Sequence, residues 1–154
     1  MTRELTGEIQ LSDLVFEILT LKHGGYCCSQ IIMKLALREL GQENPELVRA
    51  MAGLCLGAGS PEGDCGILTG AASALSLSLG TAELPDPRLP SLLSELADWF
   101  NTRVEGAYGG TSCAAILEAS PNMRACIDLL AATTEKLRAL LAGSGAAKNG
   151  ENHV

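Results

Sequence analysis

Cysteine is the residue type in this chain with the greatest capacity for chemistry. The sequence contains six, at positions 27, 28, 55, 65, 113 and 126, but only two histidines. None of them forms a Cys-x-x-Cys pair, which argues against a thioredoxin-like motif, a zinc ribbon or haem attachment. It also argues against the compact cysteine run of bacterial ferredoxins. If these cysteines act together, the fold must bring them from distant parts of the chain.

Three of the cysteines stand where a glycine-containing loop is expected to enter a helix: Cys28, Cys65 and Cys113. The free N–H groups and partial positive charge of a helix start favour a thiolate, so we expect lowered pKa values there. Glycine also lets the backbone approach a bulky ligand or inorganic sulfide closely. Three such cysteines can converge at one end of a helical bundle. Cys126 is expected about one turn into a helix that begins at Pro121.

Buried cysteines also occur simply as small apolar side chains, and this alternative stands for any one of the six. Cys55, between Leu54 and Leu56, has the character of a core residue. Cys27 and Cys28 are adjacent, so on a helix their side chains diverge by about 100°, and we expect only one to serve a site. The sequence contains no Walker-type loop, nucleophile elbow or His-Glu-x-x-His segment, and hydrolase or nucleotide chemistry is therefore not supported.

The elements that would position the cysteines are helices, because apolar residues recur at spacings of three and four and no strand signal is present. The expected helices run from Glu8 or Ser12 to Lys22, from Cys27 or Cys28 to Leu40, from Pro45 after an Asn44 cap, from Cys65 to Leu79 after an Asp64 cap, from Ser91 to Glu105, from Ser112 to Ala119, and from Pro121 to near Gly143. The sequence therefore predicts an all-α fold, a compact bundle of five to seven helices in one domain at residues 1–143. Residues 144–154 are expected to be a disordered tail.

Composition restricts the partners. The 154 residues are 47% hydrophobic and 3% aromatic, with a net charge of −7. An acidic chain without a cluster of basic residues is a poor candidate for binding nucleic acid or an anionic membrane. The first residues carry acidic side chains where a secretory signal would be basic and then apolar. We therefore expect a cytoplasmic protein, in which thiols stay reduced and serve metal binding or redox chemistry.

Two segments resemble a known family. Cys65-Gly66-Ile67-Leu68-Thr69-Gly70 resembles the central Cys-Gly-Ala-x-x-Gly segment of the putative redox-active C-GCAxxG-C-C proteins, and Gly25-Tyr26-Cys27-Cys28-Ser29-Gln30 is similar to their early Gly-x-x-Cys-Ser element. The resemblance spans roughly Leu14 to Leu141. It implies a helical fold, a redox role and four shared cysteines: Cys28, Cys65, Cys113 and Cys126. Ile67 departs from the family's alanine and would alter access to the site. Cys27 and Cys55 are extra cysteines.

Three hypotheses follow. In the first, Cys28, Cys65, Cys113 and Cys126 bind an iron–sulfur cluster, or zinc as the alternative metal, and the protein transfers electrons with a redox partner protein. Cys27, Cys55 and Gly66 are additional site candidates. In the second, the protein is a metal-free thiol–disulfide redox protein in which Cys27 with Cys28, or Cys55 with Cys65, act as nucleophile and resolving thiol.

In the third hypothesis, the protein is a non-enzymatic helical partner protein with structural cysteines. A homodimer is a further expectation, because Gly66, Gly70, Ala74 and Ser78 line one side of the predicted helix and leave a groove that a second chain could share.

Overall fold

The computed structural model describes residues 2–80 and 84–145, with side chains from residue 13 onward. Its helices are α1 (Thr2–His23), α2 (Cys28–Glu39), α3 (Pro45–Met51), the 3₁₀ helix η1 (Ala52–Leu54), α4 (Cys55–Ala58), α5 (Gly66–Leu79), α6 (Leu89–Tyr108), α7 (Cys113–Ala119) and α8 (Arg124–Ser144). The described residues contain no strand, only an isolated bridge between Asp64 and Ser112. The predicted all-α fold is confirmed.

The short element α4 differs from the other helices. Leu56 and Gly57 have φ values of +54° and +64°, and Ala58 has +58°, so this segment is a left-handed turn. Leu56 and Ala58 carry a Cβ and are strained in this conformation, which costs roughly 1–2 kcal/mol per residue. Without α4, the described residues form seven α-helices, at the upper limit of the predicted range.

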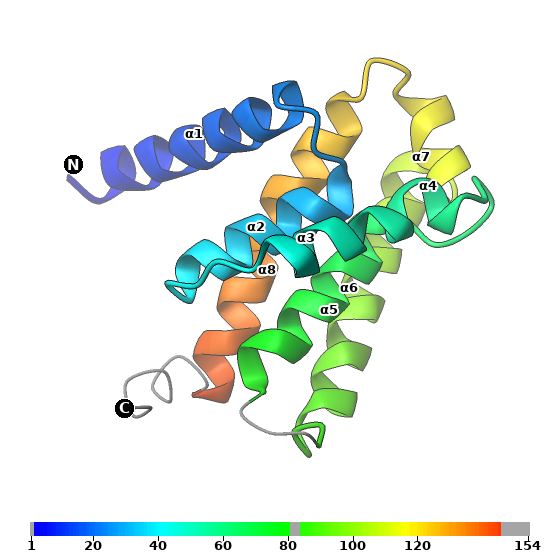
Figure 1. Cartoon of the computed structure of the whole chain (residues 1–154). Helices are drawn as coiled ribbons and strands as arrows, with labels where there is room; N and C mark the ends of the chain where they lie inside the picture. Colours follow the sequence, from blue (N-terminus) through cyan, green and yellow to red (C-terminus); the bar gives the residue numbers. More distant parts are fainter. Residues whose placement is uncertain (1, 81–83, 146–154) are drawn as a thin grey trace.

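The core lies around α5. This helix packs against α2, α6 and α8, and in the lower half of Figure 1 α5 lies between α6 and α8. The largest buried side chains, each less than 2% exposed, are Phe100, Ile18, Ile31, Ile32, Met33, Leu35, Ile67, Leu75, Leu96, Ile116, Leu129 and Leu130. Aliphatic burial therefore dominates the stability of the fold.

Helices α2 and α5 approach closely because Gly70 has no side chain. A Cβ at Gly70 would lie 2.7 Å from Ile32 Cγ2 and 2.9 Å from Ser29 Cα. The predicted row of small residues on this helix thus has a packing function within the chain. This contact fixes the first turn of α2, which carries two of the six cysteines, against the centre of the core.

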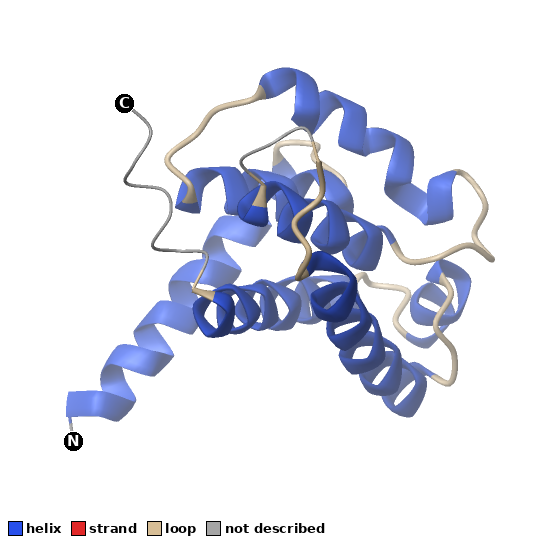
Figure 2. Cartoon of the chain, turned by 90° about the horizontal axis from the view of Figure 1, so that it is seen from below, coloured by secondary structure: helices blue, strands red, loops and turns tan. Residues whose placement is uncertain are grey.

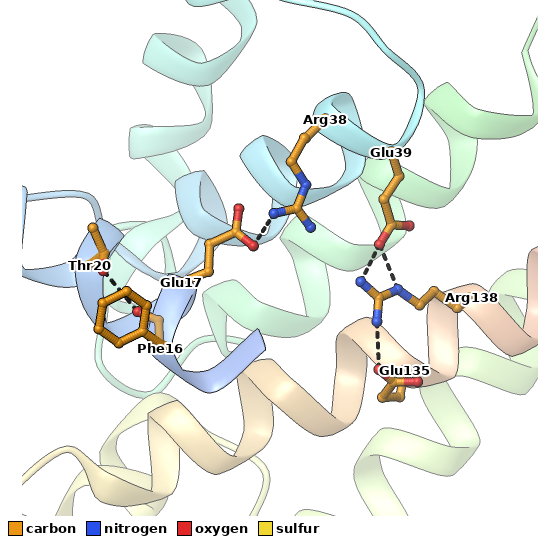
Figure 3. Close-up of polar contacts among 7 residues, drawn as sticks. All are labelled: Phe16, Glu17, Thr20, Arg38, Glu39, Glu135 and Arg138. Carbon is orange, nitrogen blue, oxygen red and sulfur yellow. Dashed lines mark hydrogen bonds and ion pairs between the residues drawn. The ribbon is translucent and has the colours of Figure 1, made fainter. Parts of the chain in front are cut away.

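Surface ion pairs connect the outer helices to α2. Arg38 on α2 pairs with Glu17 on α1, and Arg138 on α8 pairs with Glu39 at 2.5 Å and with Glu135 at 2.6 Å (Figure 3). Exposed pairs of this kind contribute about 0–1 kcal/mol each, so they orient the helices more than they stabilise them. The view from below in Figure 2 shows that the first half of α1 extends away from the other helices.

Several predicted boundaries were wrong. Helix α1 begins at Thr2, well before Glu8, and α6 extends from Leu89 to Tyr108. The N-cap of α5 is Cys65 and not Asp64. Helix α8 begins at Arg124 after a left-handed Met123, so Ser120 and Pro121 belong to the preceding turn. The Asn44 cap with Pro45 in the first turn of α3 is confirmed, because the Asn44 side chain accepts a hydrogen bond from the Leu47 N–H.

Two expectations concern the ends and the surroundings of the chain. The predicted disordered tail starts too early, because Ser144 is the last residue of α8 and Gly145 is its C-cap; from residue 146 onward the tail lies outside the described residues. Among the residues that are described, no helix combines the length and the apolar character needed to cross a membrane.

The contact at Gly70 gives a stability prediction. Gly70→Ala should lower the free energy of unfolding by about 1–3 kcal/mol, because the added methyl group collides with the α2 backbone. Gly106→Ala is the matched control: Gly106 is also helical, a Cβ there would meet nothing within 4 Å, and the change should raise stability by about 0.5–1 kcal/mol. Urea denaturation of both variants measures these changes. Equal effects of the two substitutions would contradict the packing role of Gly70.

Candidate functional site

Four of the six cysteines are free thiols: Cys28, Cys65, Cys113 and Cys126, here called the thiol cluster. Each stands at or near a helix start. Cys28 is the first residue of α2, Cys65 the N-cap of α5, Cys113 the first residue of α7, and Cys126 the third residue of α8. The electrostatic effect of the Cys126 thiolate reaches each of the other three. Cys126 is therefore the one member of the thiol cluster that interacts with all three others.

Cys28 and Cys126 are in direct contact. A side-chain hydrogen bond joins their sulfur atoms, although the residues are far apart in sequence. Cys28 is half-buried, whereas Cys126 is only 6% exposed. The pair thus combines one partly exposed cysteine with one buried cysteine.

The hydrogen bond divides the pair into a donor and an acceptor. It lowers the pKa of Cys126 from 9.0 to about 7, against the opposing effect of burial. The positive charge of Lys22, in the last turn of α1, and the backbone N–H of Cys126 contribute to this same lowering of the Cys126 pKa. The same hydrogen bond and burial raise the pKa of Cys28, which remains a thiol. Near neutral pH, the Cys28 S–H therefore donates to the Cys126 thiolate.

Cys65 and Cys113 behave differently. Burial raises the pKa of Cys65 to about 11, even though the N–H groups of Ile67 and Leu68 donate to its sulfur. Burial also raises the pKa of Cys113, and the Cys126 thiolate adds to this effect. The prediction of lowered pKa values at the three glycine-loop cysteines was therefore wrong. The helix-start effect is present at Cys65, but desolvation of the thiolate outweighs it.

The segment that carries Cys65 is held against the start of α7. The N–H of Cys113 donates to the Gly63 carbonyl at 3.2 Å, and the N–H of Ala114 donates to the Pro61 carbonyl at 2.8 Å. In Figure 1, α7 lies beside α4 and the loop that follows it. Cys65 and Cys113 are therefore held by one shared backbone framework.

Cys27 and Cys55 form a disulfide bond with each other. This corrects three expectations. Cys55 is not a plain core residue, and neither Cys27 with Cys28 nor Cys55 with Cys65 forms a pair. The predicted divergence of Cys27 and Cys28 explains the outcome: Cys27 bonds to Cys55, while Cys28 contacts Cys126.

The donor atoms of the thiol cluster suit a metal or an iron–sulfur cluster, since thiolates bind both. Among the described residues, which include every cysteine, no group of three His, Cys, Asp or Glu side chains is placed to hold one metal ion. Gly66, the remaining candidate of the predicted site, lies against the backbone of Leu54. A Cβ added to Gly66 would be 3.0 Å from the Leu54 carbonyl oxygen.

Sequence reasoning missed two residues at the site. Lys22 provides the positive charge at the Cys28–Cys126 pair, and Ser29 lies beside the disulfide with its hydroxyl 2.9 Å from Cys55 Sγ. Lys22 precedes the Gly24-Gly25 turn that returns the chain to Cys28, so its position before that loop was a usable signal. The role of Ser29 depends on the distant Cys55, and no local pattern indicates it.

The fold and the site define a cysteine-rich helical protein with one disulfide and one pair of hydrogen-bonded thiols. Residues 26–140 of the chain match the family described as "Putative redox-active protein (C_GCAxxG_C_C)". The chain belongs to this family, as its sequence motifs indicated. No curated protein and no solved structure matches the chain.

The hydrogen bond between Cys28 and Cys126 gives a pH prediction. In the wild-type protein, the ultraviolet absorbance of one thiolate should develop as the pH rises through about 7. Cys28→Ala removes the donor that lowers the pKa of Cys126 most, so the midpoint should move upward towards the ordinary value of 9.0. Cys28→Ser keeps a hydroxyl donor and should shift the midpoint less.

The raised pKa values of Cys65 and Cys113 keep these thiols out of the neutral range, so they do not obscure the titration. The same midpoint in the wild-type protein and in Cys28→Ala would show that the hydrogen bond does not control the pKa of Cys126.

Proposed function

We propose that this protein is a thiol–disulfide redox protein whose working pair is Cys28 and Cys126. One observation carries the proposal: the half-buried Cys28 thiol donates a hydrogen bond to the buried Cys126, which has a pKa of about 7. In this pair the Cys126 thiolate can accept the proton of the more accessible Cys28 as that sulfur attacks, which supplies the thiolate that thiol–disulfide exchange needs. The membership of the chain in a family described as redox-active supports the same reading.

The substrate class is a disulfide in a partner protein. The Cys126 thiolate accepts the proton of Cys28, and the Cys28 sulfur attacks one sulfur of the partner disulfide. The partner S–S bond breaks, a mixed disulfide forms at Cys28, and the partner's other sulfur leaves as a thiolate. Proton transfer from Cys126 to this thiolate then frees Cys126 to react.

In the second half of the exchange, the Cys126 thiolate attacks Cys28 Sγ and displaces the partner's remaining sulfur as a thiolate. A proton from solvent completes the partner dithiol. Two electrons have passed to the partner, and Cys28 and Cys126 are joined as a disulfide. A reducing dithiol returns the pair to its starting state by the same exchange in reverse. A cytoplasmic setting, which we also propose, would supply such reductants.

The environment assigns separate roles to the remaining thiols. The pKa values of Cys65 and Cys113 are raised as well, and Cys126 acts on these two thiols through its charge and not through a hydrogen bond that could accept their proton, so they stay protonated at neutral pH and react slowly as nucleophiles. Lys22 stabilises the negative charge that the pair carries before and during the exchange. The pair is thus the most reactive part of the thiol cluster.

A trapping experiment tests this function. In a Cys27→Ala, Cys55→Ala background, where every cross-link must involve the thiol cluster, glutathione disulfide should produce a Cys28–Cys126 disulfide that peptide mass spectrometry detects. Adding Cys126→Ser removes the resolving thiol, so a mixed disulfide should accumulate at Cys28. Adding Cys65→Ser is the control and should leave the Cys28–Cys126 disulfide in place. If oxidation instead links Cys65 to Cys113, or if no mixed disulfide accumulates, the proposed pair is wrong.

An iron–sulfur cluster is the second candidate, with electron transfer as its role. It is favoured by the presence of four thiols outside the disulfide whose charges influence one another. When bound, such a cluster supplies one-electron chemistry, and Cys28, Cys65, Cys113 and Cys126 would be its ligands after a rearrangement of their side chains. Zinc is the metal alternative for the same donor set.

Anaerobic purification distinguishes the two candidates. Iron, acid-labile sulfide and absorption near ~400 nm in the purified protein, lost in Cys65→Ser, would favour the cluster. Colourless protein in which all four thiols of the cluster titrate freely is the result expected for a thiol–disulfide redox protein. Zinc in stoichiometric amount would instead identify a structural metal site.

A further inference from the structure

The disulfide between Cys27 and Cys55 has a buried hydroxyl beside it. Ser29 is fully buried, its hydroxyl donates to the Met51 carbonyl at 2.6 Å, and its oxygen lies 2.9 Å from Cys55 Sγ. The distance from the same oxygen to Cys27 Sγ is 3.7 Å. A disulfide sulfur is a weak acceptor, so the oxidised state leaves the hydroxyl proton with Met51. A Cys55 thiolate would be a far stronger acceptor and would draw that proton to itself.

We propose that Cys27 and Cys55 form a second redox site, a reducible disulfide that a dithiol opens by attack on Cys27, with Ser29 stabilising the Cys55 thiolate that leaves. Both cysteines are half-buried, so a dithiol can reach the bond without unfolding of the chain. The site is separate from the Cys28–Cys126 pair and does not depend on the function proposed for that pair.

The exchange balances as follows. A thiolate of the dithiol attacks Cys27 Sγ, the S–S bond breaks, and its electron pair goes to Cys55, whose thiolate accepts a hydrogen bond from Ser29. The second thiolate of the dithiol then attacks its own mixed-disulfide sulfur. Cys27 leaves as a thiolate at the N-cap of α2, where the partial positive charge of the helix start favours it. The dithiol departs as a disulfide, and protons from solvent neutralise the two cysteines.

The disulfide also tethers the strained turn that follows Cys55. Leu56 and Ala58 are held at positive φ, and Gly57 packs so closely on Gly63 that a Cβ on Gly63 would lie 2.5 Å from the Gly57 carbonyl oxygen. The Gly63 carbonyl in turn accepts the Cys113 N–H. Breaking the Cys27–Cys55 bond removes one restraint on this turn and lets its strain relax. We therefore expect the accessibility of Cys65 and Cys113 to increase on reduction.

The first experiment maps the attacked sulfur in a Cys28→Ser variant of the full chain, which lacks the proposed Cys28–Cys126 pair. Glutathione, a monothiol that cannot resolve its own adduct, should give a mixed disulfide at Cys27 in most molecules, with Cys55 released as a free thiol. An adduct mainly at Cys55, or a disulfide that opens only when circular dichroism shows unfolding, would overturn the proposal. The trapping experiment for Cys28 and Cys126 can fail without affecting this result.

The second experiment tests Ser29. Ser29→Ala should slow reduction by dithiothreitol on the order of tenfold and should distribute the glutathione adduct between both cysteines, because the preferred leaving thiolate has lost its donor. Ser73→Ala is the matched control, since Ser73 also donates to a backbone carbonyl, that of Thr69 at 3.0 Å, but contacts no sulfur. A purely structural role of Ser29 would lower stability and leave the position of the adduct unchanged, and that outcome would refute the assignment.

The third experiment follows the release of the turn. After reduction of Cys27 and Cys55 in the same Cys28→Ser background, alkylation of Cys65 and Cys113 by N-ethylmaleimide should accelerate on the order of tenfold, because an untethered segment opens more often. The Cys27→Ala, Cys55→Ala variant should show the fast rate under all conditions. Unchanged rates at Cys65 and Cys113 would show that the disulfide does not control this loop.

Discussion

The close contact between α2 and α5 is the constraint on which the rest of the structure depends. Because Gly70 has no side chain, the backbone of Ser29 can lie where it would be only 2.9 Å from a Cβ on Gly70. As a result, the first turn of α2 is fixed against the centre of the core. That turn carries Cys27, Cys28 and Ser29 in succession. Both sulfur sites of the protein are therefore positioned by the same contact.

Two adjacent residues divide the chemistry of the molecule. Cys27 ends the loop and bonds to Cys55, whereas Cys28 begins the helix and contacts Cys126 on α8. The disulfide side includes a strained turn, and the thiol side includes an acidic sulfur beside Lys22. In the functions that we propose, one side responds to a reductant while the other reacts with a disulfide. The backbone between Gly57 and Cys113 connects the disulfide to the remaining thiols.

Helical periodicity and the glycine stops were sufficient to predict the all-α fold, since local spacing determines which residues can form one buried face. The Asn44 cap was also predictable, because capping depends on residues that are close in the sequence. Helix ends controlled by tertiary contacts were not predicted: Met123 is left-handed and delays the start of α8. At the site, the sequence indicated that Cys28, Cys65 and Cys113 stand at helix starts. It could not indicate that the pKa values of all three would be raised, at Cys28 by the hydrogen bond with Cys126 and by burial, and at Cys65 and Cys113 by burial, because these effects depend on residues brought together from elsewhere.

The pairing of the cysteines is likewise a property of the folded chain. Cys27 and Cys55 are 28 residues apart, and η1 and the packing of α3 on α2 bring them together. Nothing in the spacing of six cysteines selects this pair from the alternatives. The positions of Lys22 and Ser29 acquire meaning only once these pairs are known.

A disulfide map of the fully oxidised native chain tests the central claim most directly. Mass spectrometry of the protein, oxidised under native conditions and digested without reduction, should find Cys27 linked to Cys55 and Cys28 linked to Cys126, with Cys65 and Cys113 still alkylatable. A map in which Cys27 or Cys28 is linked to Cys65 or Cys113, or in which Cys126 remains a free thiol, would contradict the account.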